Sequence, residues 1–283
     1  MLTQNSRLKM HPFARKSQWR QCGCMHQQSI RAWGSKRAEA PALHPLDIGG
    51  AVSFWDFQEG PGEVRKDHGP AAAFLQEGGA PVDRSGGGIF GPYCAKFYRG
   101  SYLYVPAARC GALRLVRELT LVAWIRRHRK AERQCQAIAG IWNESWNMRQ
   151  YGLFLDLTIH GAGDNVGGHV SGTGGATPGH LWCMEAAIGA TEIGYEQWHS
   201  AAMSFRNGEV RVFLDGHLDV RPGLNPFQIA SNELFSSCGD FTVGAVDRLG
   251  EMGNWFSGEL GGLAVYDRAL DAHEIAGMCC GSA

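Results

Sequence analysis

Short runs in which apolar and polar residues alternate recur along most of the chain. The run 152–159 puts three leucines on one face and Phe154, Asp156 and Thr158 on the other. Because successive side chains of a strand point to opposite faces, this period of two predicts a strand with one core face and one open face.

A β-hairpin is expected around residue 207. The run 209–214 alternates in the same way, and the Asn207-Gly208 pair before it favours a two-residue turn between antiparallel strands. Further strands are expected at 51–57, 71–75, 95–98, 102–105, 119–125, 137–142, 199–205, 241–246 and 262–266. Many short strands separated by Gly, Asn and Asp are typical of an all-β sandwich or barrel.

Helix is expected only near the end of the sequence. In the run 268–275, Asp271 and Glu274 have the spacing of an N-terminal capping box. The predicted helix is one or two turns long, so the strands define the fold.

Composition supports a folded β domain preceded by a basic leader. Hydrophobic residues make up 44% of the chain and charged residues 19%, and 39 glycines suit many tight turns. The net charge is zero, but the first 40 residues carry eight Lys or Arg against the single acid Glu39. We therefore expect residues 1–45 to form a basic leader without regular structure and residues 46–283 to form one domain.

Neither nucleic acid nor a membrane is an expected partner. The basic leader has no helical periodicity and no regularly spaced aromatic residues on which bases could stack. No run of seven apolar residues follows it, and no stretch approaches the roughly 20 apolar residues of a membrane span. The sequence predicts neither a secretory signal nor a transmembrane segment, and it leaves the compartment open.

The nine cysteines include no pair of CxxC units with the spacing of a zinc site. Five of them, Cys94, Cys110, Cys135, Cys183 and Cys238, lie singly through the body of the chain. We expect them to be small buried hydrophobic residues, with one or two disulfides in an exported protein as the alternative.

Eight segments follow one another in a recognisable order. They are 54–60, 95–97, 102–106, 119–125, 197–202, 210–216, 256–260 and 265–270. Together they resemble the laminin-G-like, concanavalin A-like jelly-roll superfamily of lectins and glucanases. The resemblance implies an all-β, two-sheet antiparallel jelly-roll sandwich, in which Trp124 and Trp198 are expected to fill the space between the sheets.

The resemblance identifies a scaffold rather than an activity. The superfamily includes lectins, adhesion modules, accessory domains of glycoside hydrolases and some hydrolases, and its members are often extracellular. Glucanases of this fold commonly carry Glu-x-Asp-x-Glu on one strand, whereas the open face of the run 152–159 offers the single acid Asp156. No HExxH, GxSxG or P-loop motif occurs either, so a non-catalytic role is favoured.

Calcium is the one cofactor that the resemblance suggests. Family members often hold a structural Ca²⁺ near the opening and closing strands, where Asp56 and Asp67 are available in this chain. Many relatives have Asp after the Gly-x-Leu/Ile step of the closing strand, but here residues 258–262 read Gly-Glu-Leu-Gly-Gly. This departure removes an expected carboxylate, so no ligand set for the metal is assigned.

Two regions combine aromatic residues with charged and amide side chains. They are residues 141–182 and residues 247–255. Sugars are bound by aromatic faces against their C–H surfaces and by fixed polar groups that satisfy their hydroxyls. The candidate ligand-binding residues are Trp142, Asn143, Glu144, Trp146, Arg149, Asp156, His169, Arg248 and Asn254.

The favoured function is therefore a ligand-binding module, lectin-like or adhesion-like, with a glycan or glycosylated partner. Each tryptophan has the alternative of being a core residue, and each polar residue that of solvating a loop. Two other functions stay open. One is a glycan-active hydrolase with carboxylates drawn from Glu144, Glu185 and Asp156, and the other is a structural or oligomer-forming domain.

Overall fold

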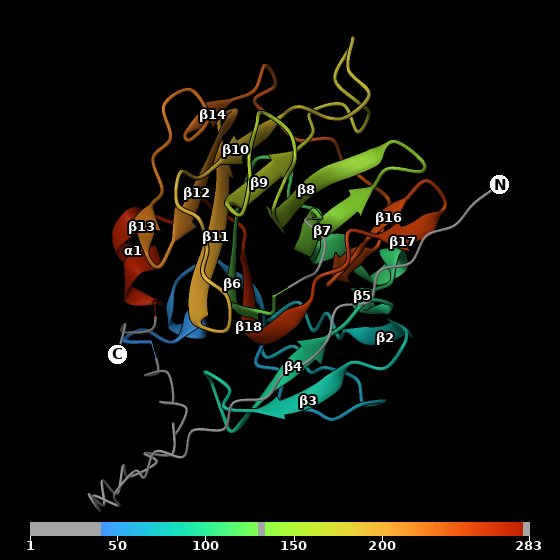
Figure 1. Ribbon diagram of the computed structural model, residues 1–283, viewed down its shortest axis with the longest axis vertical. Helices are drawn as coiled ribbons and strands as arrows, with labels where there is room; N and C mark the ends of the chain where they lie inside the picture. The colour runs from blue at the N-terminus through green and yellow to red at the C-terminus, as the bar shows by residue number, and fades with distance from the viewer. Residues whose placement is uncertain (1–40, 130–133, 280–283) are drawn as a thin grey trace, which may run out of the picture. The chain divides into compact units, whose positions relative to one another are not determined.

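The structure is a computed structural model that describes residues 41–129 and 134–279 of the 283-residue chain. In these residues the strands form two largely antiparallel sheets that face each other, which confirms the predicted two-sheet sandwich (Figure 1). Residues 1–40 of the predicted leader lie outside the described residues. Leu43, which falls within that predicted leader, already donates its backbone N–H to the carbonyl of Gly277.

The first sheet runs, in spatial order, through β13 (His217–Leu218), β12 (Glu209–Leu214), β11 (Trp198–Arg206), β6 (Glu118–Arg127), β18 (Gly258–Tyr266), β4 (Tyr93–Phe97) and β3 (Asp83–Gly86). Two further strands join it: β1 (Ala51–Trp55) pairs with β18, and β14 (Phe227–Gln228) pairs with β12.

The second sheet runs through β10 (Ala186–Ile188), β9 (Val166–Val170), β8 (Met148–Leu155), β7 (Gln136–Asn143), β15 (Phe241–Val243), β5 (Ser101–Val105) and β2 (Gln76–Gly79). β16 (Val246–Arg248) pairs in parallel with β7 and in antiparallel with β17 (Glu251–Gly253). The helices are η1 (Pro45–Asp47), η2 (Ala107–Arg109), η3 (Gly111–Leu113) and α1 (Ala272–Gly277).

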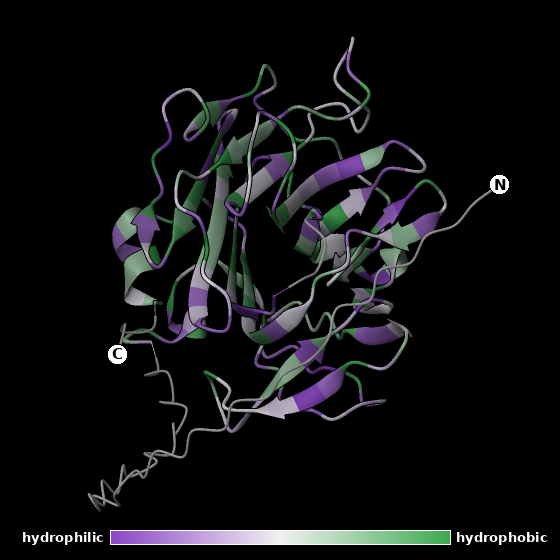
Figure 2. Cartoon of the chain, viewed as in Figure 1, coloured by the Kyte–Doolittle hydropathy of each residue, from purple (hydrophilic) through white to green (hydrophobic). Residues whose placement is uncertain are grey.

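An apolar core fills the space between the two sheets. Trp55 of β1 is fully buried there and stacks on Phe241 of β15, with ring centroids 5.6 Å apart. Because β1 belongs to the first sheet and β15 to the second, this contact joins the layers directly. By contrast, the edge strands β2 and β3 are hydrophilic, which protects their unpaired backbone groups from edge-to-edge association (Figure 2).

The predicted hairpin and helix are both confirmed. β11 ends at Arg206 and β12 begins at Glu209, and the two turn residues Asn207 and Gly208 have φ values of 50° and 78°. Asn and Gly tolerate this left-handed conformation better than other residues, which is why the turn could be predicted. Asp271 caps α1, and its reciprocal hydrogen bonds with Glu274 complete the capping box.

A second apolar surface lies on the outer face of the first sheet, and segments of the same chain cover it. Trp124 of β6 donates its Nε1–H to the carbonyl of Met278 over 3.0 Å, and the Tyr266 hydroxyl donates to the carbonyl of Pro45 over 2.9 Å. Trp198 packs against the same outer cluster. The prediction that Trp124 and Trp198 fill the space between the sheets was therefore wrong, because β6 is apolar on both faces.

The strand β8 ends four residues earlier than the predicted run 152–159. β8 stops at Leu155, and Asp156 has a φ of 59°. This reversal turns Asp156 towards Arg127 of β6, whereas Leu157 joins Phe154 in a separate outer cluster on the second sheet. The alternating pattern put Leu157 on the core face and Asp156 on the open face. In the structure each lies on the opposite side from the one predicted.

The thiols of the body of the chain are mostly buried. Cys94, Cys110 and Cys183 are buried and Cys238 is exposed, and none of these four forms a disulfide. Burial raises the pKa of Cys94 to about 12 and that of Cys110 to about 11, so both stay protonated. The expectation of small buried residues, made for five cysteines, is met by three; Cys135 is half-buried, and the expectation was wrong for Cys238.

Asp67 fixes the start of the fold. Its carboxylate accepts hydrogen bonds from the backbone N–H groups of Phe54 (2.9 Å), Gly69 (2.8 Å) and Ala73 (2.7 Å) and from the hydroxyl of Ser53 (2.8 Å). A single buried acid therefore ties β1 to the segment 67–73.

We predict that Asp67→Ala lowers the free energy of unfolding by about 3 kcal/mol or more, because each buried donor left without an acceptor costs about 1–3 kcal/mol. Urea unfolding of both proteins measures the difference. Asp83→Ala, at an exposed position of β3, is the control and should change stability by less than about 0.5 kcal/mol. Equal effects of the two substitutions would contradict this role for Asp67.

Candidate functional site

Rings and glycines alternate on the outer face of the second sheet. His169 of β9 lies opposite Gly152 of β8, and Phe154 of β8 lies opposite Gly167 of β9. A Cβ atom at Gly152 would come within 2.6 Å of the Phe154 ring, and one at Gly167 within 2.4 Å of Leu157 Cδ1. The absence of side chains at the two glycines lets Phe154 and Leu157 lie close to the sheet.

A small cavity of about 110 Å³ opens above this surface. We call it the Phe154 cavity; it is lined by Cys135, Glu144, Phe154, Leu157, Thr158, Ile159, His169, Trp182, Cys183, Arg248 and Asn254. Four of the sequence-predicted residues therefore come together here: Glu144, His169, Arg248 and Asn254.

His169 is held as a neutral ring. It packs on Trp142 with ring centroids 4.1 Å apart, and its Nε2 lies 2.8 Å from the carbonyl oxygen of Cys183. A carbonyl can only accept, so Nε2 carries the proton. Burial lowers the pKa of His169 to about 3, against the opposing effect of the Cys183 hydrogen bond. Near neutral pH the ring is therefore uncharged and its Nδ1 is an acceptor.

A connected group of polar side chains forms another part of the lining. Glu144 Oε1 accepts from Trp142 Nε1 over 3.2 Å, and Glu144 Oε2 lies 3.4 Å from Arg248 Nε. Arg248 Nη1 donates to Asn254 Oδ1 over 3.1 Å, and its guanidinium lies 4.8 Å from the centroid of the Trp182 ring. The charges of Glu144 and Arg248 thus offset each other beside an aromatic surface.

Asp247 joins the two hairpins that supply these groups. Its carboxylate accepts from Asn143 Nδ2 over 3.0 Å and from the Ser145 hydroxyl, and its backbone carbonyl accepts from the Glu144 N–H over 2.9 Å. The β7–β8 turn and the β16–β17 hairpin, about 100 residues apart in sequence, are held side by side in this way.

The remaining predicted residues do not line the Phe154 cavity. Trp142 is 2% exposed and supports His169 from beneath, Asn143 bonds Asp247, and Arg149 is buried against the carbonyl of Gly174. Trp146 is 72% exposed on the β7–β8 turn, two residues from Glu144.

Asp156 belongs to an internal ion cluster. Its carboxylate accepts from Arg127 Nη1 over 3.1 Å and from Gln136 Nε2 over 3.0 Å. Arg127 Nη1 also reaches Asp164 over 3.2 Å, and the guanidinium stacks on Tyr195, 4.0 Å from its ring centroid. Asp156 therefore connects the end of β8 to β6 and does not share a cavity with Glu144.

Several lining residues were not among the predicted candidates. Phe154 was placed on an open strand face and Trp182 within an aromatic-rich region, but Leu157, Ile159 and Cys183 carry no polar signal in the sequence. The sequence signal that could have found them is the pair of glycines at 152 and 167. Gly152 lies two residues before Phe154 and opposite His169, and Gly167 lies two residues before His169 and opposite Phe154. The two glycines leave room for Phe154 and Leu157 to lie against the sheet, where both line the cavity.

Among residues 41–129 and 134–279, no group of three or more His, Cys, Asp or Glu side chains is arranged to hold a metal ion. Both oxygens of Asp67 accept hydrogen bonds from the protein, and Asp56 faces His68 at 3.2 Å. Glu259, on the closing strand, pairs with Arg126. These contacts give the two aspartates and Glu259 structural partners of their own.

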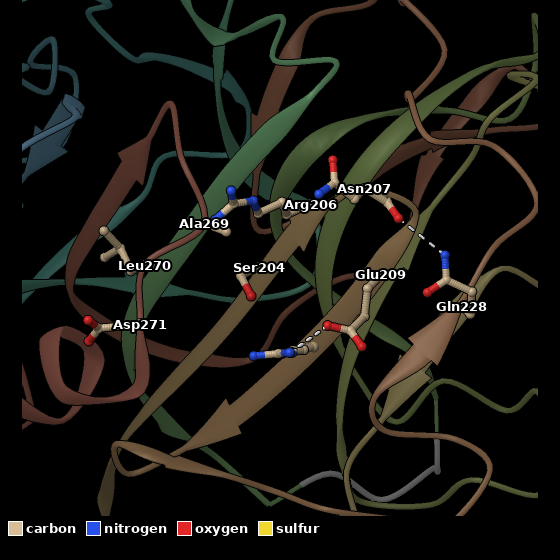
Figure 3. A pocket seen from close by; sticks show the side chains of 9 residues that line it. Ser204, Arg206, Asn207, Glu209, Gln228, Ala269, Leu270 and Asp271 are labelled. Atoms are coloured by element: carbon tan, nitrogen blue, oxygen red, sulfur yellow. Dashed lines mark hydrogen bonds and ion pairs between the residues drawn. The ribbon is translucent and has the colours of Figure 1, made fainter.

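A larger cavity, of about 410 Å³, lies on the first sheet beside the β11–β12 hairpin. We call it the β11–β12 groove. Figure 3 shows Ser204, Arg206 and Glu209 with Gln228 on one side and Leu270 and Asp271 on the other. Its lining has no aromatic side chain, and its arginines are paired, Arg206 with Glu118 at 3.3 Å and Arg211 with Glu209 at 2.6 Å. It therefore lacks the stacking surface that the Phe154 cavity has.

Within the described part of the chain, none of the helices has the length and apolarity needed to cross a membrane.

The sequence profile described as the concanavalin A-like lectin/glucanases superfamily matches residues 99–276 of the chain. No curated protein matches the chain. The match therefore covers most of the sandwich, including both hairpins that border the Phe154 cavity.

Three of the solved structures with similar folds are an arabinanase domain, a sialidase and a bacterial toxin. Domain 4 of AbnA, a GH43 extracellular arabinanase from Geobacillus stearothermophilus in complex with arabinotriose, has a TM-score of 0.55 at 15% identity, covering 81% of this chain and 98% of that one. Trypanosoma rangeli sialidase with the inhibitor DANA has a TM-score of 0.54 at 17% identity, covering 84% and 34%. Botulinum neurotoxin type C, whose entrance into cells depends on two ganglioside molecules, has a TM-score of 0.55 at 12% identity, covering 80% and 49%.

The chain thus spans about a third of the sialidase and about half of the toxin chain, but nearly all of the arabinanase domain. At these identities the three likenesses show the fold alone.

The Asp156 cluster generates a pH prediction. Burial raises the pKa of Asp156 to about 6, the hydrogen bond with Asp164 acts in the same direction, and Gln136 and Arg127 oppose them. The folded pKa exceeds the unfolded value of about 3.9, so this group's stabilising contribution is present below pH 4 and is lost as the pH rises through 6. In Asp156→Asn this loss should disappear, so wild type should lose stability relative to the variant between pH 4 and pH 6. Urea unfolding of wild type and Asp156→Asn at four pH values tests this, with Asp83→Asn as control. A difference in free energy of unfolding between wild type and Asp156→Asn that does not change with pH would contradict it.

Proposed function

The chain belongs to the concanavalin A-like lectin/glucanases superfamily, and from this premise we propose that it is a carbohydrate-binding module whose site is the Phe154 cavity. The observation that carries the proposal is the meeting, in one cavity, of the rings of Phe154, His169 and Trp182 with the polar groups of Glu144, Arg248 and Asn254. Aromatic faces bind the C–H surfaces of sugars, and fixed donors and acceptors orient their hydroxyls.

The size and rigidity of the cavity support recognition of one sugar unit. A volume of about 110 Å³ is below the roughly 300–1,000 Å³ of sites that enclose drug-sized ligands. Its walls are held by the contacts of Asp247 and by the packing of His169 on Trp142. Trp146, exposed two residues from Glu144, extends the proposed site towards further units of a longer glycan.

Similar proteins give independent support. An arabinanase domain of this fold is known in complex with arabinotriose, and a toxin of this fold depends on gangliosides. Both are glycan ligands, which makes a glycan or a glycosylated molecule the partner that we propose here. The alternative of a glycan-cleaving enzyme is weaker, because Asp156 is held by Arg127 and Gln136 away from the cavity that Glu144 lines.

We predict that Trp182→Ala weakens glycan binding at least about tenfold, which corresponds to about 1.4 kcal/mol. The substitution removes an aromatic wall and the surface on which Arg248 rests. Glycan-array screening followed by calorimetric titration of the strongest binder measures it. Arg211→Ala, in the β11–β12 groove, is the control and should bind as wild type does. Unaltered binding by Trp182→Ala, or no glycan bound at millimolar concentration, would contradict the proposal.

A second prediction concerns Gly167. In Gly167→Ala the new Cβ would come within 2.4 Å of Leu157 Cδ1, the end of a flexible side chain, so Leu157 should shift and change the floor of the cavity. We expect weaker glycan binding with little loss of stability. Gly86→Ala is the matched control because a Cβ there meets nothing within 4 Å. Calorimetric titration and thermal unfolding of both variants check the expectation, and equal affinities for the two would count against it.

A further inference from the structure

Two buried side chains of the Phe154 cavity have hydrogen-bonding capacity that the protein does not use. Asn254 and His169 are each 5% exposed. Asn254 Oδ1 faces the guanidinium of Arg248, which can only donate, so the amide NH₂ points elsewhere. Among the described residues, no acceptor bonds Asn254 Nδ2 and no donor bonds His169 Nδ1. Both residues line the cavity, so a ligand that supplies an acceptor and a donor there satisfies them. Glu144 Oε2 and Arg248 Nε are two further buried atoms of the lining that have no hydrogen-bond partner among the described residues.

The ligand must therefore offer an acceptor to Asn254 and a donor to His169. The floor adds a third requirement, because Phe154 and Leu157 present carbon to the cavity and favour an apolar group. A net charge on the ligand has no counterpart, since Glu144 and Arg248 already pair with each other and the His169 ring is neutral.

A secondary amide that ends in a methyl group meets all three requirements. Its carbonyl accepts, its N–H donates, and its methyl group packs on carbon. A sugar hydroxyl supplies a donor and an acceptor but carries no apolar group of its own to pack on the floor. Resting on the carbohydrate-binding function proposed above, we infer that the Phe154 cavity recognises the acetamido group of a 2-acetamido-2-deoxy sugar.

The test compares pairs of sugars that differ only at this group. Calorimetric or NMR titration of the full chain uses the methyl glycosides of N-acetylglucosamine and N-acetylgalactosamine against those of glucose and galactose. We expect the acetamido member of at least one pair to bind tenfold or more tightly. A difference below twofold in both pairs, with sugars still bound, would overturn the inference and leave the proposed function standing. Failure of every sugar to bind would instead overturn the proposed function.

Two variants locate the preference. Asn254→Asp keeps an acceptor for Arg248 but replaces the free NH₂ donor by a carboxylate oxygen, so the acetamido preference should fall below twofold. Leu157→Ala makes more room at the floor of the cavity. The affinity for an N-propionyl glycoside, relative to that for the N-acetyl glycoside, should therefore be higher in this variant than in wild type. Arg211→Ala should change neither ratio. A preference that survives Asn254→Asp and does not shift in Leu157→Ala would place recognition elsewhere and contradict the inference. A peptide carrying Nε-acetyl-lysine that binds as tightly as the sugar would contradict the restriction to saccharides.

Discussion

The whole arrangement depends on sheets that are apolar on both faces. One face of each sheet meets the other sheet in the core, where Trp55 stacks on Phe241. The remaining face must still be covered, because a large exposed apolar patch is unfavourable in water. On the first sheet, η1, α1 and the residues after it cover that face, and Trp124 is fixed beneath them by the carbonyl of Met278. On the second sheet, loop residues such as Leu157 and Cys183 cover the face only in part. The Phe154 cavity is what this partial cover leaves.

Local sequence signals predicted the parts of the fold that local chemistry determines. Asn207-Gly208 adopts the left-handed conformation that a tight hairpin turn requires, and Asp271 with Glu274 satisfies the free N–H groups at the start of α1. The sequence analysis placed Trp124 on the wrong face because the residues around it are apolar on both faces of the strand. Alternation then gives no indication of which face belongs to the core. Asp156 was placed on the wrong face because a single positive φ ends the period of two.

The candidate site was only partly predictable for a different reason. Glu144, His169, Arg248 and Asn254 were selected for their chemistry. Contacts between two hairpins that are distant in sequence, those of Asp247 among them, bring Glu144 and Arg248 together. Trp142 is an aromatic residue of the kind that stacks on sugars, yet it is 2% exposed and packs under the His169 ring, with ring centroids 4.1 Å apart. The apolar lining, Leu157 and Ile159, could not be separated from core residues in the sequence alone. Burial decides these roles, and burial is a property of the folded chain.

We propose that a glycan binds on the outer face of the second sheet, over Phe154. Solution NMR of the chain with labelled leucine and isoleucine methyl groups tests this most directly, because each cavity has its own reporter. Leu157 and Ile159 line the Phe154 cavity, whereas Leu270 lines the β11–β12 groove. On titration with a glycan that binds the protein, we expect the Leu157 and Ile159 methyl signals to shift and the Leu270 signals to stay unchanged. Shifts confined to Leu270, with Leu157 and Ile159 unaffected, would contradict it.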